Sequence, residues 1–142
     1  MSVQITGITK LSHLLVEFYE KMSSWEHDVV KNSGLSPAQM HAIEIVGNTV
    51  SLPMKELAGK LGVTTGTLTV MVDRLEEQRL LQRMPHEKDR RSWLVELTDK
   101  GRMHFHQHHQ YHLRLTEEIT ATLSAEQQEI FGVLLAKIIS RM

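Results

Sequence analysis

The fold is decided by the stretch ELAGKLGVTTGTLTVM at residues 56–71. Two short segments with helical apolar spacing meet at Gly62, which is the arrangement of a helix-turn-helix. Ala58 is small where two helices must cross closely, and Gly62 allows the positive φ that a tight turn requires. The sequence therefore predicts a helical hairpin whose shared core comes from five apolar side chains: Leu57, Leu61, Val63, Leu68 and Met71.

The second helix of this hairpin begins with a run of short hydroxyl side chains. Thr64 is expected to cap the helix, which then runs from Thr65 to about Gln78. Small side chains and a glycine allow close approach to a phosphate backbone and to base edges in a major groove. An ordinary helical hairpin in which the threonines serve only as caps gives the same local pattern. The nucleic-acid contacts that this helix predicts are Thr64, Thr65, Gly66, Thr67, Thr69 and Arg74.

A charged ribbon follows the hairpin directly. Residues 80–84 and 92–97 are typical of two strands, and the loop at 85–91 joins them. Lys88, Arg90 and Arg91 place positive charge at the loop tip, and Asp89 is expected to pair with one of the arginines and hold the loop's shape. Most charged turns are simply solvated. A ribbon placed directly after a helix-turn-helix instead predicts a winged helix, whose tip reaches the DNA backbone or the adjacent minor groove.

Longer helices flank this central part. Apolar spacing predicts helices at about 9–31, 37–47 and 98–122 and a last helix after Ser124, with Ser36, Ser51, Thr98 and Ser124 as caps. The predicted fold is mainly α (α+β): a winged helix-turn-helix with N- and C-terminal dimerisation helices. We expect a single domain over 1–142, with dimerisation helices at about 1–34 and 99–142 and the DNA-binding part at about 35–98.

Composition excludes several classes of protein. The 142 residues are 41% apolar and 23% charged, with a net charge of −1 and no cysteine. Disulfides, thiolate metal sites and thiol redox sensing are therefore excluded. No stretch approaches a membrane helix or the apolar core of a signal peptide, so a cytoplasmic protein without a membrane partner is expected. Because the net charge is near zero, any nucleic-acid binding must come from local charge.

Several motifs together resemble the MarR family of bacterial transcription regulators. They are LSPAQ at 35–39, ELA at 56–58, TGTLT at 65–69, DRLE at 73–76, and DxR at 89–91 followed by VxLTxxG at 95–101. The resemblance covers nearly the whole chain. It implies an obligate homodimer in which two winged helices read a pseudo-palindrome in double-stranded DNA. It also implies a repressor that acts on its own gene or a nearby one. The apolar stripes of the terminal helices predict dimerisation independently.

The histidines raise the question of an effector. His108 and His112 lie four residues apart on one face of a helix, where two imidazoles can bind one metal ion. The chain is also similar to a zinc-responsive subgroup of the family. That similarity implies a site in which His41 and an acid from the first helix join this pair. Glu26 is the preferred acid, with His27 as the alternative, and zinc is the candidate cofactor.

The same residues allow other interpretations. An aromatic or lipophilic effector could occupy a cleft between helices, with walls from Trp25, Met40, His41 and Phe105. The histidines could also be surface or core residues, or give pH sensitivity. A metal-dependent hydrolase using Glu117 and Glu118 is a remote alternative, because no nucleophile motif or phosphate loop is present. A purely structural or metal-buffering dimer would bind no duplex saturably.

Overall fold

The computed structural model describes residues 7–142, which form two compact units that meet between Phe105 and His106. The first unit contains the sheet and the helix-turn-helix, and the second contains the last helix. In chain order the elements are α1 (Gly7–Val30), α2 (Pro37–Gly47), β1 (Leu52–Pro53), α3 (Met54–Leu61), α4 (Thr65–Glu77), β2 (Leu81–Pro85), β3 (Trp93–Leu97), α5 (Asp99–Thr120) and α6 (Ala125–Ile139).

Short polar residues begin helices α2 and α6 as the sequence predicts. The Ser36 hydroxyl accepts the backbone N–H of Gln39 at 3.1 Å, and the Gln39 side chain accepts the N–H of Ser36 at 3.0 Å. Pro37 occupies the first helical position, where its missing N–H costs nothing. Ser124 and Gln127 form the same capping box at the start of α6, with distances of 3.1 and 2.9 Å. These reciprocal bonds confirm both predicted helix starts.

The predicted cap at Ser51 is wrong. The chain is extended at this point, and Leu52 pairs with Val95 as a short third strand, β1. Helix α3 begins after Pro53, which makes no side-chain capping hydrogen bond. The physical reason is that a residue before proline is driven out of the helical region, here into a strand that buries the Leu52 side chain.

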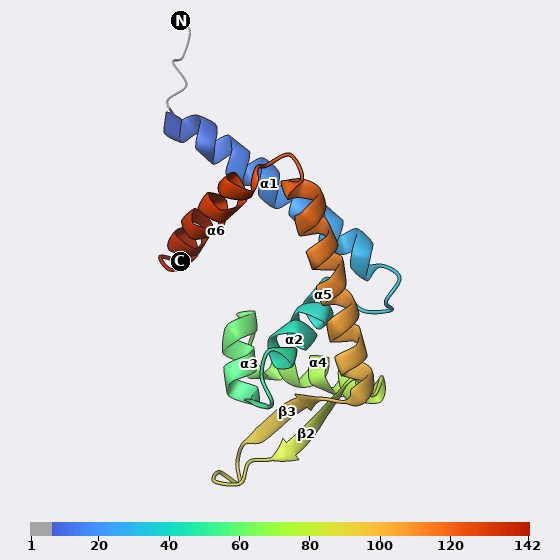
Figure 1. The fold of residues 1–142 in the computed structure, drawn as a ribbon. Coiled ribbons are helices and arrows are strands. Elements are labelled where there is room, and N and C mark those ends of the chain that lie inside the picture. The colour runs from blue at the N-terminus through green and yellow to red at the C-terminus, as the bar shows by residue number, and fades with distance from the viewer. Residues whose placement is uncertain (1–6) are drawn as a thin grey trace, which may run out of the picture. The chain divides into compact units, whose positions relative to one another are not determined.

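The sheet is antiparallel, with the strand order β1-β3-β2. Leu81 lies opposite Leu97 at the base of the β2–β3 ribbon, and Pro85 lies opposite Trp93 near its tip. The ribbon predicted at 80–84 and 92–97 is therefore confirmed to within one residue. Figure 1 shows the ribbon projecting from the body formed by α2, α3 and α4.

The hydrophobic core belongs to the winged-helix part. Among the described residues, every buried large apolar side chain lies between Val30 and Leu97. Phe105 packs against this core, and a Cβ added to Gly47 would collide with its ring. A Cβ on Gly101 would likewise collide with the carbonyl oxygen of Leu80. The first turns of α5 therefore dock closely on the winged helix.

Helix α6 has a different environment. None of its side chains is buried, although it carries large apolar residues along its length. Its exposed apolar side chains are Ile130, Phe131, Val133, Leu134, Leu135, Ile138 and Ile139. Within residues 7–142, no helix combines the length and the apolar composition needed to cross a bilayer.

Candidate nucleic-acid interface and candidate metal ligands

The turn between α3 and α4 has the geometry that the sequence predicts. Gly62 ends α3 in the left-handed region, with φ of 66°. The Val63 N–H then donates to the Ala58 carbonyl at 3.1 Å, which closes the turn. Ala58 is buried where the helices cross, and Leu57 and Leu68 meet in the core with no exposed surface. The two helices therefore form one rigid hairpin.

The first turns of α4 present a smooth, hydroxyl-rich surface. Thr64 is the N-cap, and its hydroxyl oxygen accepts the Thr67 N–H at 3.1 Å. The Thr69 hydroxyl donates back to the carbonyl of Thr65 at 2.8 Å, so it lies along the helix. The exposed residues of this surface include all six predicted on α4: Thr64, Thr65, Gly66, Thr67, Thr69 and Arg74. Because the side chains are short and held against the helix, α4 can come close to a groove floor.

The tip of the ribbon is shaped by its own hydrogen bonds. One Asp89 carboxylate oxygen accepts the backbone N–H of Arg91 at 3.0 Å, and the other accepts the Ser92 hydroxyl at 2.8 Å. These two hydrogen bonds hold the pKa of Asp89 below its usual value, and the bond from the Arg91 N–H has the larger effect. The expected pairing of Asp89 with an arginine side chain is therefore corrected: the partner at position 91 is the main-chain N–H.

The cationic groups of the tip lie on the surface of the loop. The ring Nδ1 of His86 accepts the N–H groups of Lys88 and Asp89 at 3.1 and 3.2 Å, which curls the loop. Lys88, Arg90 and Arg91 are all exposed. Three cations on a short, ordered loop can bind phosphate or enter a narrow minor groove.

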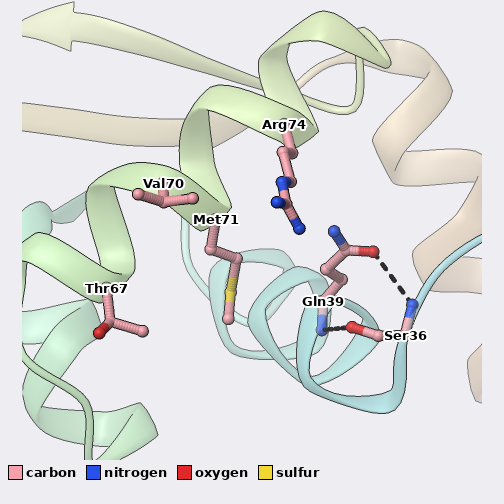
Figure 2. A pocket seen from close by; sticks show the side chains of 6 residues that line it. All are labelled: Ser36, Gln39, Thr67, Val70, Met71 and Arg74. Atoms are coloured by element: carbon pink, nitrogen blue, oxygen red, sulfur yellow. Dashed lines mark hydrogen bonds between the residues drawn. The ribbon is translucent and has the colours of Figure 1, made fainter.

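A cavity of about 330 Å³ lies between the start of α2 and the exposed face of α4. Figure 2 shows the Arg74 and Gln39 side chains pointing toward one another across it, with Met71 between the two helices. From the sequence, Ser36 was expected only as a helix cap, and Gln39 appeared only within the motif LSPAQ at 35–39. The structure places them beside Thr67 and Arg74, because the same box that starts α2 also turns its first residues toward α4. No local sequence pattern indicates this long-range contact.

A second cavity, of about 370 Å³, lies between α3, α4 and the start of β3. Thr65 and Thr69 line it from α4, and Arg91 and Trp93 line it from the ribbon. The half-exposed indole of Trp93 therefore belongs to the same surface as the hydroxyl groups of α4. Trp93 was not predicted from the sequence, although an aromatic residue beside the charged tip was a usable signal.

Two pairs of possible metal ligands occur, one in each unit. In the second unit, the Nε2 atoms of His108 and His112 lie 3.0 Å apart, and their rings meet edge to face at 4.7 Å. In the first unit, carboxylate oxygens of Glu26 and Glu44 lie within 4.8 Å of each other. Imidazole nitrogen and carboxylate oxygen are the donors that zinc takes when no thiolate is available, so both pairs fit that ion chemically.

The other candidate ligands lie elsewhere on their helices. His41 is exposed on α2, three residues before Glu44. Glu44 was not singled out from the sequence, although it follows His41 by about one helical turn. His27 is exposed, and its Nδ1 lies 2.9 Å from the carbonyl oxygen of Ser23. Burial, and secondarily the charge of Lys100, lowers the pKa of His104, so this residue favours its neutral form.

The helical hairpin, the exposed hydroxyl face of α4 and the basic ribbon tip define a winged helix-turn-helix protein. Comparison with known proteins identifies the family. Residues 35–93 match the MarR family. The multiple antibiotic resistance protein MarR of Escherichia coli (strain K12) is 32% identical over an alignment of 124 positions, which covers 83% of this chain and 86% of that protein. The chain belongs to the MarR family of DNA-binding transcriptional regulators.

Solved structures agree with this assignment. A MarR family protein from Bacillus stearothermophilus shares the fold with a TM-score of 0.89 at 21% identity, covering 99% of each chain. A mutant of E. coli MarR complexed with operator DNA has a TM-score of 0.73 at 28% identity, covering 96% of this chain and 99% of that one. Members of the family are transcription regulators and not enzymes, so the hydrolase alternative is abandoned.

Proposed function

We propose that the chain is a homodimeric repressor that binds a pseudo-palindromic operator through α4 and the ribbon tip. The observation that carries this proposal is the exposed face of α4, from Thr64 to Arg74, which lies in the same compact unit as the basic tip at 88–91. A helix of this kind contacts base edges in the major groove, while arginine at the tip is suited to the minor groove. Crystals of a mutant of the related E. coli protein contain operator DNA, which supports DNA as the partner of this chain.

Dimerisation is supported by apolar surface that this chain leaves exposed. Leu11, Leu14 and Leu15 of α1 are each about half exposed, and α6 exposes a comparable set. Apolar surface on this scale marks an interaction site, and two-fold symmetry is the commonest way in which identical chains cover it. A two-fold dimer carries two recognition helices, which matches the two half-sites of a pseudo-palindrome.

For the effector we propose zinc, bound by His108 and His112. The close approach of their Nε2 atoms, at 3.0 Å, supports this choice because a pair spaced four apart can bind one ion. The resemblance to zinc-responsive relatives adds Glu26 and His41 as partners. Within the first unit, carboxylate oxygens of Glu26 and Glu44 lie within 4.8 Å of each other and form an acidic pair of their own. Zinc would supply bonds that join ligands from several helices and would favour one conformation of the dimer over another.

A small organic effector is the competing proposal. Cavities of about 330 and 370 Å³ are large enough for such a compound, and the first combines Arg74 with the apolar side chains of Val70 and Met71. The walls expected from the sequence need revision, because Met40 is buried in the core and Phe105 packs against it.

The DNA part of the proposal is tested with Arg90→Ala. We expect weaker binding to every duplex, because one phosphate contact is removed. The slope of the logarithm of the affinity against the logarithm of the salt concentration should become shallower by about one. Fluorescence anisotropy at several salt concentrations measures both. An unchanged salt dependence would remove Arg90 from the interface.

The zinc part is tested by chelator competition on the untagged protein. We expect His108→Ala and His112→Ala to abolish tight binding, and His41→Ala and Glu44→Gln to show which residue of α2 contributes. His109→Ala is the matched control, because position 109 does not share the face of the His108–His112 pair. His108→Ala should also abolish the effect of zinc on operator binding while leaving zinc-free affinity nearly intact. Equal zinc affinity in all variants would favour the organic effector.

A further inference from the structure

Helix α4 and the β2–β3 ribbon are joined by an ionic cluster around Arg83. Arg83 lies in the middle of β2, and its guanidinium Nη2 pairs with a carboxylate oxygen of Asp73 on α4. Its Nε lies 3.5 Å from the Oε1 atom of Glu76, one turn further along α4. The same Oε1 atom accepts the backbone N–H of Arg83 at 3.0 Å. Both the main chain and the side chain of one residue are thus held by two acids of the recognition helix.

The Arg83 and Glu76 members of this cluster are partly sheltered from solvent. The Arg83 side chain is 24% exposed and that of Glu76 is 33% exposed. The Nε atom is shielded from solvent and has no hydrogen-bond partner among the described residues, so the Glu76 carboxylate provides its charge compensation. The planar guanidinium spans both acids, which a lysine ammonium cannot do in the same way. This geometry fixes the orientation of β2 relative to α4 as well as the distance between them.

The position of Arg83 along β2 gives the cluster its importance. In the part of the ribbon that leads to the tip, Leu81 is the last buried residue of β2, and Gln82, Met84 and Pro85 are exposed. Beyond Leu81, apolar packing therefore no longer holds β2 against the body. The contacts of Arg83 with Asp73 and Glu76 extend the attachment two residues closer to the cationic tip.

We propose that Arg83 is a positioning residue that fixes the direction of the β2–β3 ribbon, the wing, relative to α4. Because Arg83 holds the ribbon against α4, this helix and the tip at 88–91 contact DNA at the same time and at a fixed spacing. The inference rests on the proposed DNA-binding function and adds to it a specificity-determining element that does not touch DNA.

The sign of one substitution separates this role from simple electrostatics. Asp73 is half exposed and lies one position before Arg74, so its negative charge opposes phosphate binding. If charge alone mattered, Asp73→Asn would strengthen binding to DNA. If the link to Arg83 positions the wing, Asp73→Asn weakens binding despite removing a negative charge. Because Asp73 is on the surface, the substitution is compatible with folding.

The experiment uses a duplex recovered from a random-sequence pool by the wild-type protein. We expect Arg83→Gln to weaken binding about tenfold and Asp73→Asn several-fold. In hydroxyl-radical footprints, both variants should lose protection at the flanks, where the tip binds, and keep it at the major-groove centre. In the Arg83→Gln background, adding Arg90→Ala should cost less than twofold, because the tip is no longer placed to bind. Gln82→Ala is the matched control, since Gln82 pairs with Glu96 within the ribbon and not with α4.

Amide hydrogen exchange in the free protein provides a second measurement that needs no DNA. Faster exchange in Arg83→Gln, confined to residues 82–94, is the expected sign of a loosened wing. Full additivity of Arg83→Gln and Arg90→Ala, retained flank protection or stronger binding by Asp73→Asn would each overturn the proposal. If the wild-type protein recovered no duplex, the proposed DNA-binding function would fail as well, and the exchange data would still show whether Arg83 anchors the ribbon.

Discussion

The winged-helix part and helix α6 use the same local signals but differ in where their apolar side chains lie. Both contain a serine–glutamine capping box, at Ser36 and at Ser124. In the winged-helix part, apolar residues such as Ile43 and Leu68 have no exposed surface. In α6, Leu134 and Ile138 are each about half exposed.

This difference shows that the two regions achieve stability in different ways. The winged helix covers its apolar residues with its own chain, so its core can form without a partner. Helix α6 leaves its apolar residues uncovered and needs another surface to bury them. Local sequence signals decide that both regions are helical, but they do not decide which of them is complete within one chain.

The largest expected effect comes from placing a charge on the exposed apolar surface of α6. Leu134→Glu should separate the dimer, because an unpaired carboxylate cannot be buried in an apolar interface. Loss of simultaneous binding to two half-sites should then weaken operator binding by about a hundredfold or more. Sedimentation and fluorescence anisotropy measure the two effects. Glu129→Gln is a polar control on the same helix. A fully dimeric Leu134→Glu protein would refute the comparison between the two regions.

A smaller effect is expected from a cavity in the winged helix. Leu68 is fully buried, so Leu68→Ala should lower the free energy of unfolding by about 3 kcal/mol. Val70, on the same helix, is half exposed, and Val70→Ala should change it by about 0.5 kcal/mol or less. Urea titrations followed by circular dichroism provide the measurement. Equal losses for the two variants would show that this core is not closed within one chain.

The two capping boxes allow a matched test of the comparison. Ser36→Ala and Ser124→Ala should each cost about 1 kcal/mol, because each removes the acceptor for a helix N–H. We expect Ser36→Ala to lower the melting temperature without altering dimer dissociation, and Ser124→Ala to raise the dimer dissociation constant. Asparagine at either position should restore the cap. If Ser124→Ala left dimer dissociation unchanged, α6 would not belong to the interface.

The smallest effect concerns the ribbon tip, which lies outside the core of the winged helix. Because the pKa of Asp89 is lowered in the folded loop, the loop binds a proton less readily than the open chain does. The contribution of Asp89 is therefore present above its ordinary pKa of 3.8 and is lost as the pH falls through the lowered value. Amide exchange at Arg91 and Ser92 should accelerate over this range. Asp89→Asn should remove that pH dependence, and an identical profile in the variant would exclude Asp89 as its source.

Much of the fold was predictable because its signals are local. The helix starts at Ser36 and Ser124 and the turn at Gly62 depend on neighbouring residues, and all three were predicted. The strand at Leu52 was missed because it depends on pairing with Val95, more than 40 residues away. The proline after Leu52 indicated an extended chain, but a capping serine beside it was the more familiar pattern.

The candidate site was less predictable, because several of its contacts join residues from separate elements. The exposed threonines of α4 follow from their spacing on one helix. The contact of Arg83 with Asp73 and the placing of Gln39 beside Arg74 join separate elements, and no pattern within either element indicates them. The same holds for Glu44, which becomes a candidate beside Glu26 only when α1 and α2 are seen in the folded chain.

The close approach of Gly101 to the carbonyl of Leu80 has an evolutionary consequence. Any side chain at position 101 would collide with that backbone oxygen. A substitution there therefore cannot be neutral unless α5 shifts along its axis. The Thr98 hydroxyl and the Lys100 ammonium, which bond to the carbonyls of Arg79 and Gln78, tie down the same corner. Sequence change in descendants of this protein is therefore more constrained at this joint than at exposed positions of α5 such as Met103.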